Sequence, residues 1–149
     1  MAKMVLIIDD DTNTVKFLSA VLEDHGYETD AAYDGAAGFE KLQTLTPDLI
    51  VLDVMMPKKT GFTLFKQIRN EERFKNLPVL MLTGVAGVLE ELDAQSDDTH
   101  ERPYDQLRET LRGHIKEMRD EGLIKPDMFV DKPVDPDAFV KRVSDLIGV

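Results

Sequence analysis

Short hydrophobic runs alternate along this chain with longer segments in which apolar residues recur every three or four positions. Four of the runs are compact blocks of aliphatic and aromatic residues, at 4–8, 49–52, 79–82 and, more weakly, 128–130. Nearly continuous hydrophobicity over so few residues is typical of parallel strands that helices cover on both faces. Residues 27–33 instead alternate between apolar and polar, which predicts a half-exposed strand near the edge of the sheet.

The segments between these runs have the period of about 3.6 residues that amphipathic helices show. Gly26 suits the end of the first helix, and Pro136 suits the first turn of the last one. Strands that alternate with helices predict an α/β fold with a doubly wound, five-stranded parallel sheet. The residues expected to face the core are Val15, Leu18 and Leu22; Ala36, Phe39 and Leu42; Leu64, Phe65 and Ile68; and Phe139, Val143 and Ile147.

The stretch 83–132 is too long for a single crossover between two strands. It has room for an additional helix at 104–121, with one apolar stripe and Gly122 as its stop. We therefore expect one domain over residues 1–149 with a helical insertion at about 90–125. The insertion either contacts a partner or is a tolerated surface excursion.

Composition and charge exclude several classes of function. A chain of 149 residues is long enough for one domain with a hydrophobic core. The absence of cysteine excludes disulfides and thiolate chemistry. With 29 acidic and 18 basic residues the net charge is −11, which argues against direct binding of nucleic acid. The sequence shows no membrane span and no signal peptide, so we expect a cytoplasmic protein without membrane contact.

Polar residues follow the predicted strands at the edge where open α/β sheets bind their ligands. Parallel strands end at a common edge, so residues that are distant in sequence are expected to converge there. The residues at these positions are Asp9, Asp10, Asp11, Asp53, Thr83, Lys132 and Pro133.

The acidic residues of this set allow a structural and a functional interpretation. Asp11 is expected to cap the first helix, which needs only one side chain. Adjacent carboxylates repel one another unless a cation is present, and Mg²⁺ prefers such hard oxygen ligands. Asp53 ends an apolar run, where a carboxylate is costly without a partner. It either forms a structural pair with Lys132 or belongs, with Asp9 and Asp10, to a metal and phosphoryl site.

The remaining residues suit the same chemistry. The hydroxyl of Thr83 can bind a phosphoryl oxygen, and the ammonium of Lys132 offers a positive charge to it. The alternatives are a helix cap at Thr83 and a solvated Lys132. A cis peptide before Pro133 would direct the lysine at the site, although most X–Pro bonds are trans.

Four motifs in this order resemble the response-regulator receiver domains (CheY-like family) of two-component signal transduction. They are 5–11 (VLIIDDD), 47–57 (PDLIVLDVMMP), 78–83 (PVLMLT) and 129–133 (FVDKP). The resemblance covers nearly the whole chain outside the insertion. It implies a flavodoxin-like sheet with strand order 2-1-3-4-5.

Carried over residue by residue, the resemblance implies a phosphoacceptor and a metal site. Asp53 would accept the phosphoryl group in a magnesium-dependent reaction, with Mn²⁺ as an alternative cation. Asp10 and Asp53 would ligate the metal through their carboxylates and Met55 through its backbone carbonyl. Asp9 would support the metal through water.

The resemblance also implies a conformational switch. Thr83 and Lys132 would bind the phosphoryl group, supported by Pro133, and Thr83 with Phe129 would form the switch. The phosphoryl donor would be a sensor histidine kinase, a phosphotransfer protein or a small phosphodonor. Such a domain turns over no external substrate. Since the sequence ends at Val149, we expect no output domain in the chain and signalling to a protein partner. A homodimer is left open, because the insertion adjoins the family's usual dimerisation face.

Three other functions are weighed against this one. A phosphatase of the haloacid-dehalogenase type would need a second acid two residues after Asp53, where Met55 stands. A flavodoxin-like cofactor binder would need a glycine-rich or hydroxyl-bearing first loop, whereas Asp9–Asp11 would repel a phosphate without a metal. The third function is an interaction module that is independent of phosphorylation. The sequence neither supports nor excludes it.

Overall fold

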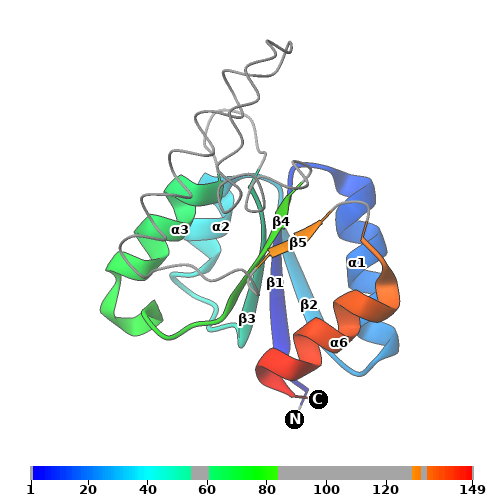
Figure 1. Cartoon of the computed structure of the whole chain (residues 1–149). Helices are drawn as coiled ribbons and strands as arrows, with labels where there is room; N and C mark the ends of the chain where they lie inside the picture. The colour runs from blue at the N-terminus through cyan, green and yellow to red at the C-terminus, as the bar shows by residue number, and fades with distance from the viewer. Residues whose placement is uncertain (1, 55–60, 84–128, 132–133, 149) are drawn as a thin grey trace, which may run out of the picture.

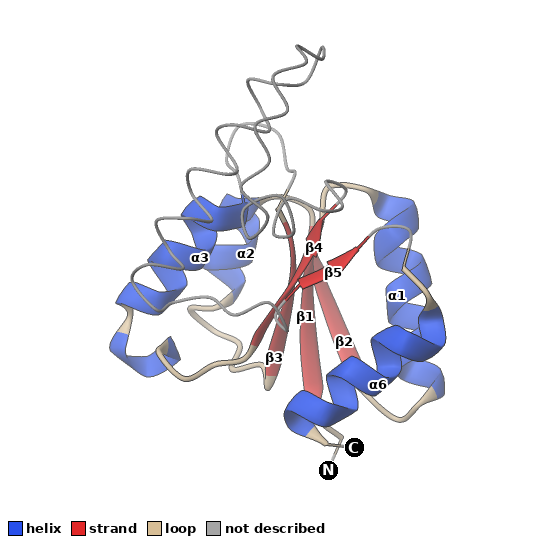
Figure 2. Cartoon of the chain, in the orientation of Figure 1, coloured by secondary structure: helices blue, strands red, loops and turns tan. Residues whose placement is uncertain are grey.

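The computed structural model describes residues 2–54, 61–83, 129–131 and 134–148, with the backbone alone at positions 62, 83, 129 and 131. Within them, five parallel strands form one sheet in the order β2-β1-β3-β4-β5 (Figure 2), which confirms the expected doubly wound order. The predicted insertion at about 90–125 lies outside the described residues. The strands are β1 (Met4–Ile8), β2 (Glu28–Ala32), β3 (Leu49–Asp53), β4 (Val79–Thr83) and β5 (Phe129–Asp131).

Helices cover both faces of this sheet. In Figure 1, α1 and α6 lie on one face, and α2 and α3 lie on the other. No described helix is long and apolar enough to cross a membrane. The helices are α1 (Thr12–Asp24), α2 (Gly35–Lys41), α3 (Gly61–Asn70) and α6 (Pro136–Ile147), and a short 3-10 helix, η1 (Glu72–Phe74), follows α3.

The core consists of two layers, one on each side of the sheet. Leu6 and Ile8 of β1 belong to the layer under α2 and α3, and Val5 and Ile7 belong to the layer under α1 and α6. All four side chains are fully buried, which explains why the strand is apolar at every position. The predicted stripes of α1, α3 and α6 face these layers.

The apolar face predicted for α2 was partly wrong. Leu42 is buried and Phe39 packs against the core, but Ala36 is exposed, and Gly35 and Gly38 are buried in its place. A side chain at Gly38 would come within 2.6 Å of the Ile8 Cδ1 atom. The helix therefore lies on β1 through a residue without a side chain, a contact that hydrophobic periodicity does not reveal.

The C-terminal end of α1 is fixed by local hydrogen bonds. Gly26 has φ 90°, in the left-handed region that glycine tolerates, directly after the cap residue of α1. Its N–H donates to Glu23 O, and the Tyr27 N–H donates to Leu22 O, both at 3.1 Å. The Tyr27 hydroxyl donates to the Gly148 carbonyl at 2.8 Å, and burial raises the pKa of this phenol.

Arg69 fastens the end of α3 to the loop that enters β4. Its Nη1 donates to the carbonyls of Phe74 at 3.0 Å and Leu77 at 2.6 Å. The guanidinium lies 4.9 Å from the centroid of the Phe65 ring. Burial lowers the pKa of Arg69 from its ordinary value. The Phe74 carbonyl also accepts from the Leu77 N–H at 3.1 Å, so the turn before β4 is held both by its own backbone and by Arg69.

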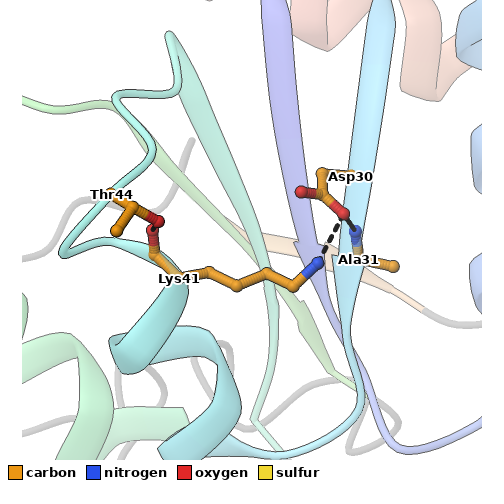
Figure 3. A network of polar contacts seen from close by, with 4 residues as sticks. All are labelled: Asp30, Ala31, Lys41 and Thr44. Carbon is orange, nitrogen blue, oxygen red and sulfur yellow. Dashed lines mark hydrogen bonds and ion pairs between the residues drawn. The ribbon is translucent and has the colours of Figure 1, made fainter.

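The exposed strand predicted at 27–33 lies at the edge of the sheet, as expected. On this edge Asp30 of β2 accepts hydrogen bonds from Lys41 Nζ at 2.6 Å and from the Ala31 N–H at 2.8 Å, and the Thr44 hydroxyl donates to the Lys41 carbonyl (Figure 3). Burial by itself would raise the pKa of Asp30, but Lys41 and the Ala31 N–H hold this pKa below its ordinary value of 3.8.

The Asp30–Lys41 pair is expected to contribute little to the free energy of unfolding, and only at pH values where Asp30 is ionised. Lys41→Met should lower the free energy of unfolding by less than about 1 kcal/mol at pH 7, because both side chains are partly solvated. A depressed folded-state pKa stabilises the protein above the unfolded-state value, so the deficit should fade as pH falls through the pKa of folded Asp30. Urea unfolding at pH 7 and at a pH well below 3.8, with Lys16→Met as an exposed control, measures this deficit. A deficit that grows towards low pH would contradict this account.

Candidate phosphoryl and metal site

The register of the sheet brings Asp9 and Asp53 to neighbouring strand ends. Ile8 of β1 lies opposite Leu52 of β3, so the next residues along the chain, Asp9 and Asp53, lie at the same level of the sheet. The Asp9 N–H donates to the Ala32 carbonyl of β2 at 3.1 Å. Asp53 lies opposite Leu82 of β4. Both backbones are therefore held by the strands around them.

Three carboxylates converge at this edge. Oxygen atoms of Asp9, Asp10 and Asp53 lie within 4.8 Å of one another. Asp9 is 0% and Asp53 2% exposed, and within the described part of the chain they are the only buried charged residues. Asp10 is exposed at the rim. Burial of two carboxylates so close together is costly unless positive charge compensates it.

The donor set fits a small divalent cation. Mg²⁺ takes hard oxygen ligands, is held by one or two carboxylates, and keeps positions for water and phosphate oxygens. Two buried carboxylates and one at the rim match this preference. The Asp11 N–H donates to Asp9 Oδ1 at 2.9 Å, which fixes the orientation of the Asp9 carboxylate.

Asp11 itself has a structural role, as expected. Its Oδ1 accepts from the Asn13 N–H at 3.0 Å, and its Oδ2 accepts from the Thr14 hydroxyl at 2.9 Å. These bonds cap the N-terminus of α1. The three adjacent aspartates therefore have different roles. Asp11 caps α1, whereas Asp9 and Asp10 lie at the site with Asp53.

The other predicted site residues are described in part or not at all. The Thr83 backbone ends β4 opposite Asp131 of β5, and the Phe129 backbone lies opposite Met81. The carboxyl ends of β4 and β5 therefore reach the same edge as the three aspartates. The side chains of Thr83 and Phe129 lie outside the described part of the structure, as do Met55, Lys132 and Pro133, so their roles stay predictions.

Residues 5–112 match the family described as the response regulator receiver domain. This chain belongs to that family. Receiver domains are signalling domains of two-component response regulators, not enzymes that turn over a separate substrate. The predicted family, fold and two-component signalling role are thereby confirmed.

Relatives and solved structures agree with this assignment. The DNA-binding dual master transcriptional regulator RpaA of Synechocystis sp. is 40% identical over 104 residues, which cover 68% of this chain and 43% of that protein. The response regulator ArlR of Staphylococcus saprophyticus is 31% identical over 145 residues, covering 94% of this chain and 63% of that protein. The chemotaxis protein CheY4 of Vibrio cholerae superposes with a TM-score of 0.70 at 27% identity, over 98% of this chain and 99% of that one.

This receiver chain spans less than two thirds of the length of both curated relatives, at 43% and 63%. The words DNA-binding and transcriptional regulator in the name of RpaA describe the whole RpaA protein.

One residue at the site of this receiver domain was missed by sequence reasoning. Gly61 begins α3, and its N–H donates to the Val54 carbonyl at 3.2 Å, next to Asp53. The available signal was a glycine at the first position of an amphipathic segment, where most other residues favour helix more strongly. Its significance depends on the backbone that it meets in the folded chain.

Proposed function

We propose that this receiver domain accepts a phosphoryl group on Asp53 in a magnesium-dependent reaction and changes conformation to signal to a protein partner. The observation that carries the proposal is the convergence of Asp9, Asp10 and Asp53 at the carboxyl edge of the sheet. Asp53 is a buried member of this cluster and the last residue of a central strand, so its position is firmly fixed.

The proposed reaction is an in-line displacement at phosphorus. A carboxylate oxygen of Asp53 forms a bond to phosphorus while the bond from phosphorus to the donor's histidine nitrogen breaks, and that bonding pair stays on the nitrogen. Phosphoryl transfer depends mainly on positioning and on neutralising charge. The β1 and β4 neighbours of Asp53 supply the positioning.

The metal would be held by the carboxylates of Asp10 and Asp53 and the backbone carbonyl of Met55, with Asp9 acting through water. Bound Mg²⁺, or Mn²⁺ in its place, supplies neutralisation of the phosphoryl oxygens. Lys132 would add a positive charge, supported by Pro133.

The switch would follow the gain of negative charge at Asp53. Strong acceptor oxygens on the new phosphoryl group would attract the Thr83 hydroxyl, and Phe129 would respond to the movement of Thr83. A surface near β4 and β5 would thereby shift between two states.

We further propose a single domain over residues 1–149 that acts in the cytoplasm, with the insertion at about 90–125 beside its output surface. A sensor histidine kinase or a phosphotransfer protein would be its donor. Its net charge of −11 disfavours nucleic acid as a direct partner of this part. A homodimer through the output surface is a second arrangement to be tested.

Intact-protein mass spectrometry after incubation with acetyl phosphate tests the reaction. We expect one phosphoryl adduct in Mg²⁺ and none in excess EDTA. Asp10→Asn should raise the Mg²⁺ concentration needed by about 10- to 100-fold, since losing a ligand costs at least as much as losing an outer-shell partner. An absence of adduct in Mg²⁺, where a known receiver reacts, would overturn the proposal and favour an interaction module that does not use phosphorylation.

A further inference from the structure

We propose that Gly61 is a positioning residue for Asp53. Its bare Cα lets the first turn of α3 lie directly on the main chain of Asp53, and this contact sets where the Asp53 carboxylate stands relative to Asp9 and Asp10. The proposal rests on the proposed function of Asp53 as phosphoacceptor, and it adds a residue that touches neither metal nor phosphate.

The contact is between backbone atoms. A Cβ atom added at Gly61 would overlap the Asp53 carbonyl oxygen and lie 3.0 Å from Asp53 C and 2.9 Å from Val54 Cα. The Gly61 N–H also donates to the Val54 carbonyl at 3.2 Å. The start of α3 is thus both packed on and hydrogen-bonded to the two residues at the end of β3.

Neither partner of this contact can move away cheaply. Asp53 ends β3, which is paired with β1 on one side and β4 on the other, and the Val54 N–H donates to the Leu82 carbonyl at 3.0 Å. On the other side, α3 is anchored by Phe65 and Ile68, both fully buried. A side chain at Gly61 would therefore displace the Asp53–Val54 backbone, which directs the carboxylate.

The backbone conformation of Gly61 allows the steric effect of an added side chain to be tested without backbone strain. Among the described glycines only Gly26 and Gly148 have a positive φ, so alanine at position 61 meets no left-handed strain. Alanine also favours helix more than glycine does. The expected damage from Gly61→Ala therefore comes from the contact with Asp53 and Val54, and not from an unfavourable helix.

Gly26→Ala is the matched control. Nothing lies within 4 Å of a Cβ built at Gly26, yet its φ of +90° makes any side chain strained. Gly26 precedes β2 and so lies at the opposite edge of the sheet from the aspartates. This variant should lose stability without moving Asp53.

The experiment compares wild type, Gly61→Ala and Gly26→Ala. Urea unfolding followed by circular dichroism measures stability, paramagnetic resonance of free Mn²⁺ measures cation binding, and intact mass measures the adduct rate against acetyl phosphate concentration. We expect Gly61→Ala to lower both the Mn²⁺ affinity and the saturating adduct rate, the latter by about 10- to 100-fold, because a misplacement on the order of 1 Å has that effect. Gly26→Ala should change both by less than about twofold, a difference well below that misplacement effect.

Each outcome decides one proposal. A folded Gly61→Ala with wild-type rate and Mn²⁺ affinity would overturn the positioning role while the function of Asp53 stands. If wild type forms no adduct, the proposed function fails, and the Mn²⁺ comparison alone decides about Gly61. If Gly61→Ala does not fold in buffer, all three proteins are compared in an osmolyte that favours the folded state. Failure to fold there would overturn the positioning role, since Gly61 would then serve the fold alone.

Discussion

Asp53→Asn is expected to abolish the phosphoryl adduct and at the same time to make the metal-free protein harder to unfold. An amide oxygen is a poor nucleophile towards phosphorus, so no adduct should form from acetyl phosphate in Mg²⁺. The same substitution removes one of three negative charges whose oxygens lie within 4.8 Å of each other. In EDTA we therefore expect the free energy of unfolding to rise by about 1 kcal/mol or more.

The response to metal separates these two effects. Mg²⁺ at 100 times its dissociation constant should stabilise wild type by about 2.7 kcal/mol, because it binds only the folded state. Asp53→Asn should gain much less, so the stability difference seen in EDTA should shrink or reverse. Urea unfolding with and without Mg²⁺ measures both terms.

Asp48→Asn provides the control for this substitution. Asp48 directly precedes β3, at the edge opposite the site, and its Oδ2 accepts from the Met4 N–H at 2.8 Å. This variant should phosphorylate as wild type does and should show no stabilisation in EDTA. An adduct of unchanged amount in Asp53→Asn would place the acceptor elsewhere in the chain.

Phe65→Ala is expected to cost about 3–5 kcal/mol of unfolding free energy, the range typical of a fully buried phenylalanine. The ring is 0% exposed in the layer between the sheet and the α2–α3 pair. It also supports Arg69, whose guanidinium lies over it. Domains are stable by only about 5–15 kcal/mol, so a large fraction of the variant would be unfolded in mild denaturant.

Phe65→Ala should also slow phosphorylation at Asp53. Phe65 anchors α3, whose first residue packs on the Asp53 backbone, so the folded fraction should also form adduct more slowly. Phe17→Ala, at a side chain that is 44% exposed on α1, should change stability by no more than about 0.5 kcal/mol. Urea unfolding of both variants at one temperature makes the comparison. A cost below about 1 kcal/mol for Phe65→Ala would show that the layer refills the cavity.

Local physical chemistry was enough to predict most of the scaffold from the sequence. The run at 4–8 is β1 residue for residue, because a strand covered on both faces must be apolar throughout. The last described strand, Phe129–Asp131, contains Phe129 and Val130 of the predicted run at 128–130, and Met128 lies outside the described residues. Asp11 caps α1, because its side chain reaches N–H and hydroxyl groups only two and three residues away.

The site was predictable to the extent that strand ends define it. In a parallel sheet the carboxyl ends of neighbouring strands meet, which is why the sequence alone was enough to group Asp9, Asp10 and Asp53. The grouping of these three is confirmed. The phosphoryl-binding and switch roles of Thr83, Lys132 and Phe129 stay predictions.

By itself, the sequence determined the strands, the described α-helices, the caps of α1 and the edge at which the acidic residues gather, because each depends on neighbours along the chain or on a repeating pattern. Only the tertiary structure decided which face of α2 meets the core and what Gly61 does. Gly38 lies on Ile8, and Gly61 lies on the backbone of Asp53, because a helix can approach a strand so closely only where it carries no side chain. Such contacts join residues that are far apart in the chain and leave no periodic signal, so the folded backbone had to reveal them.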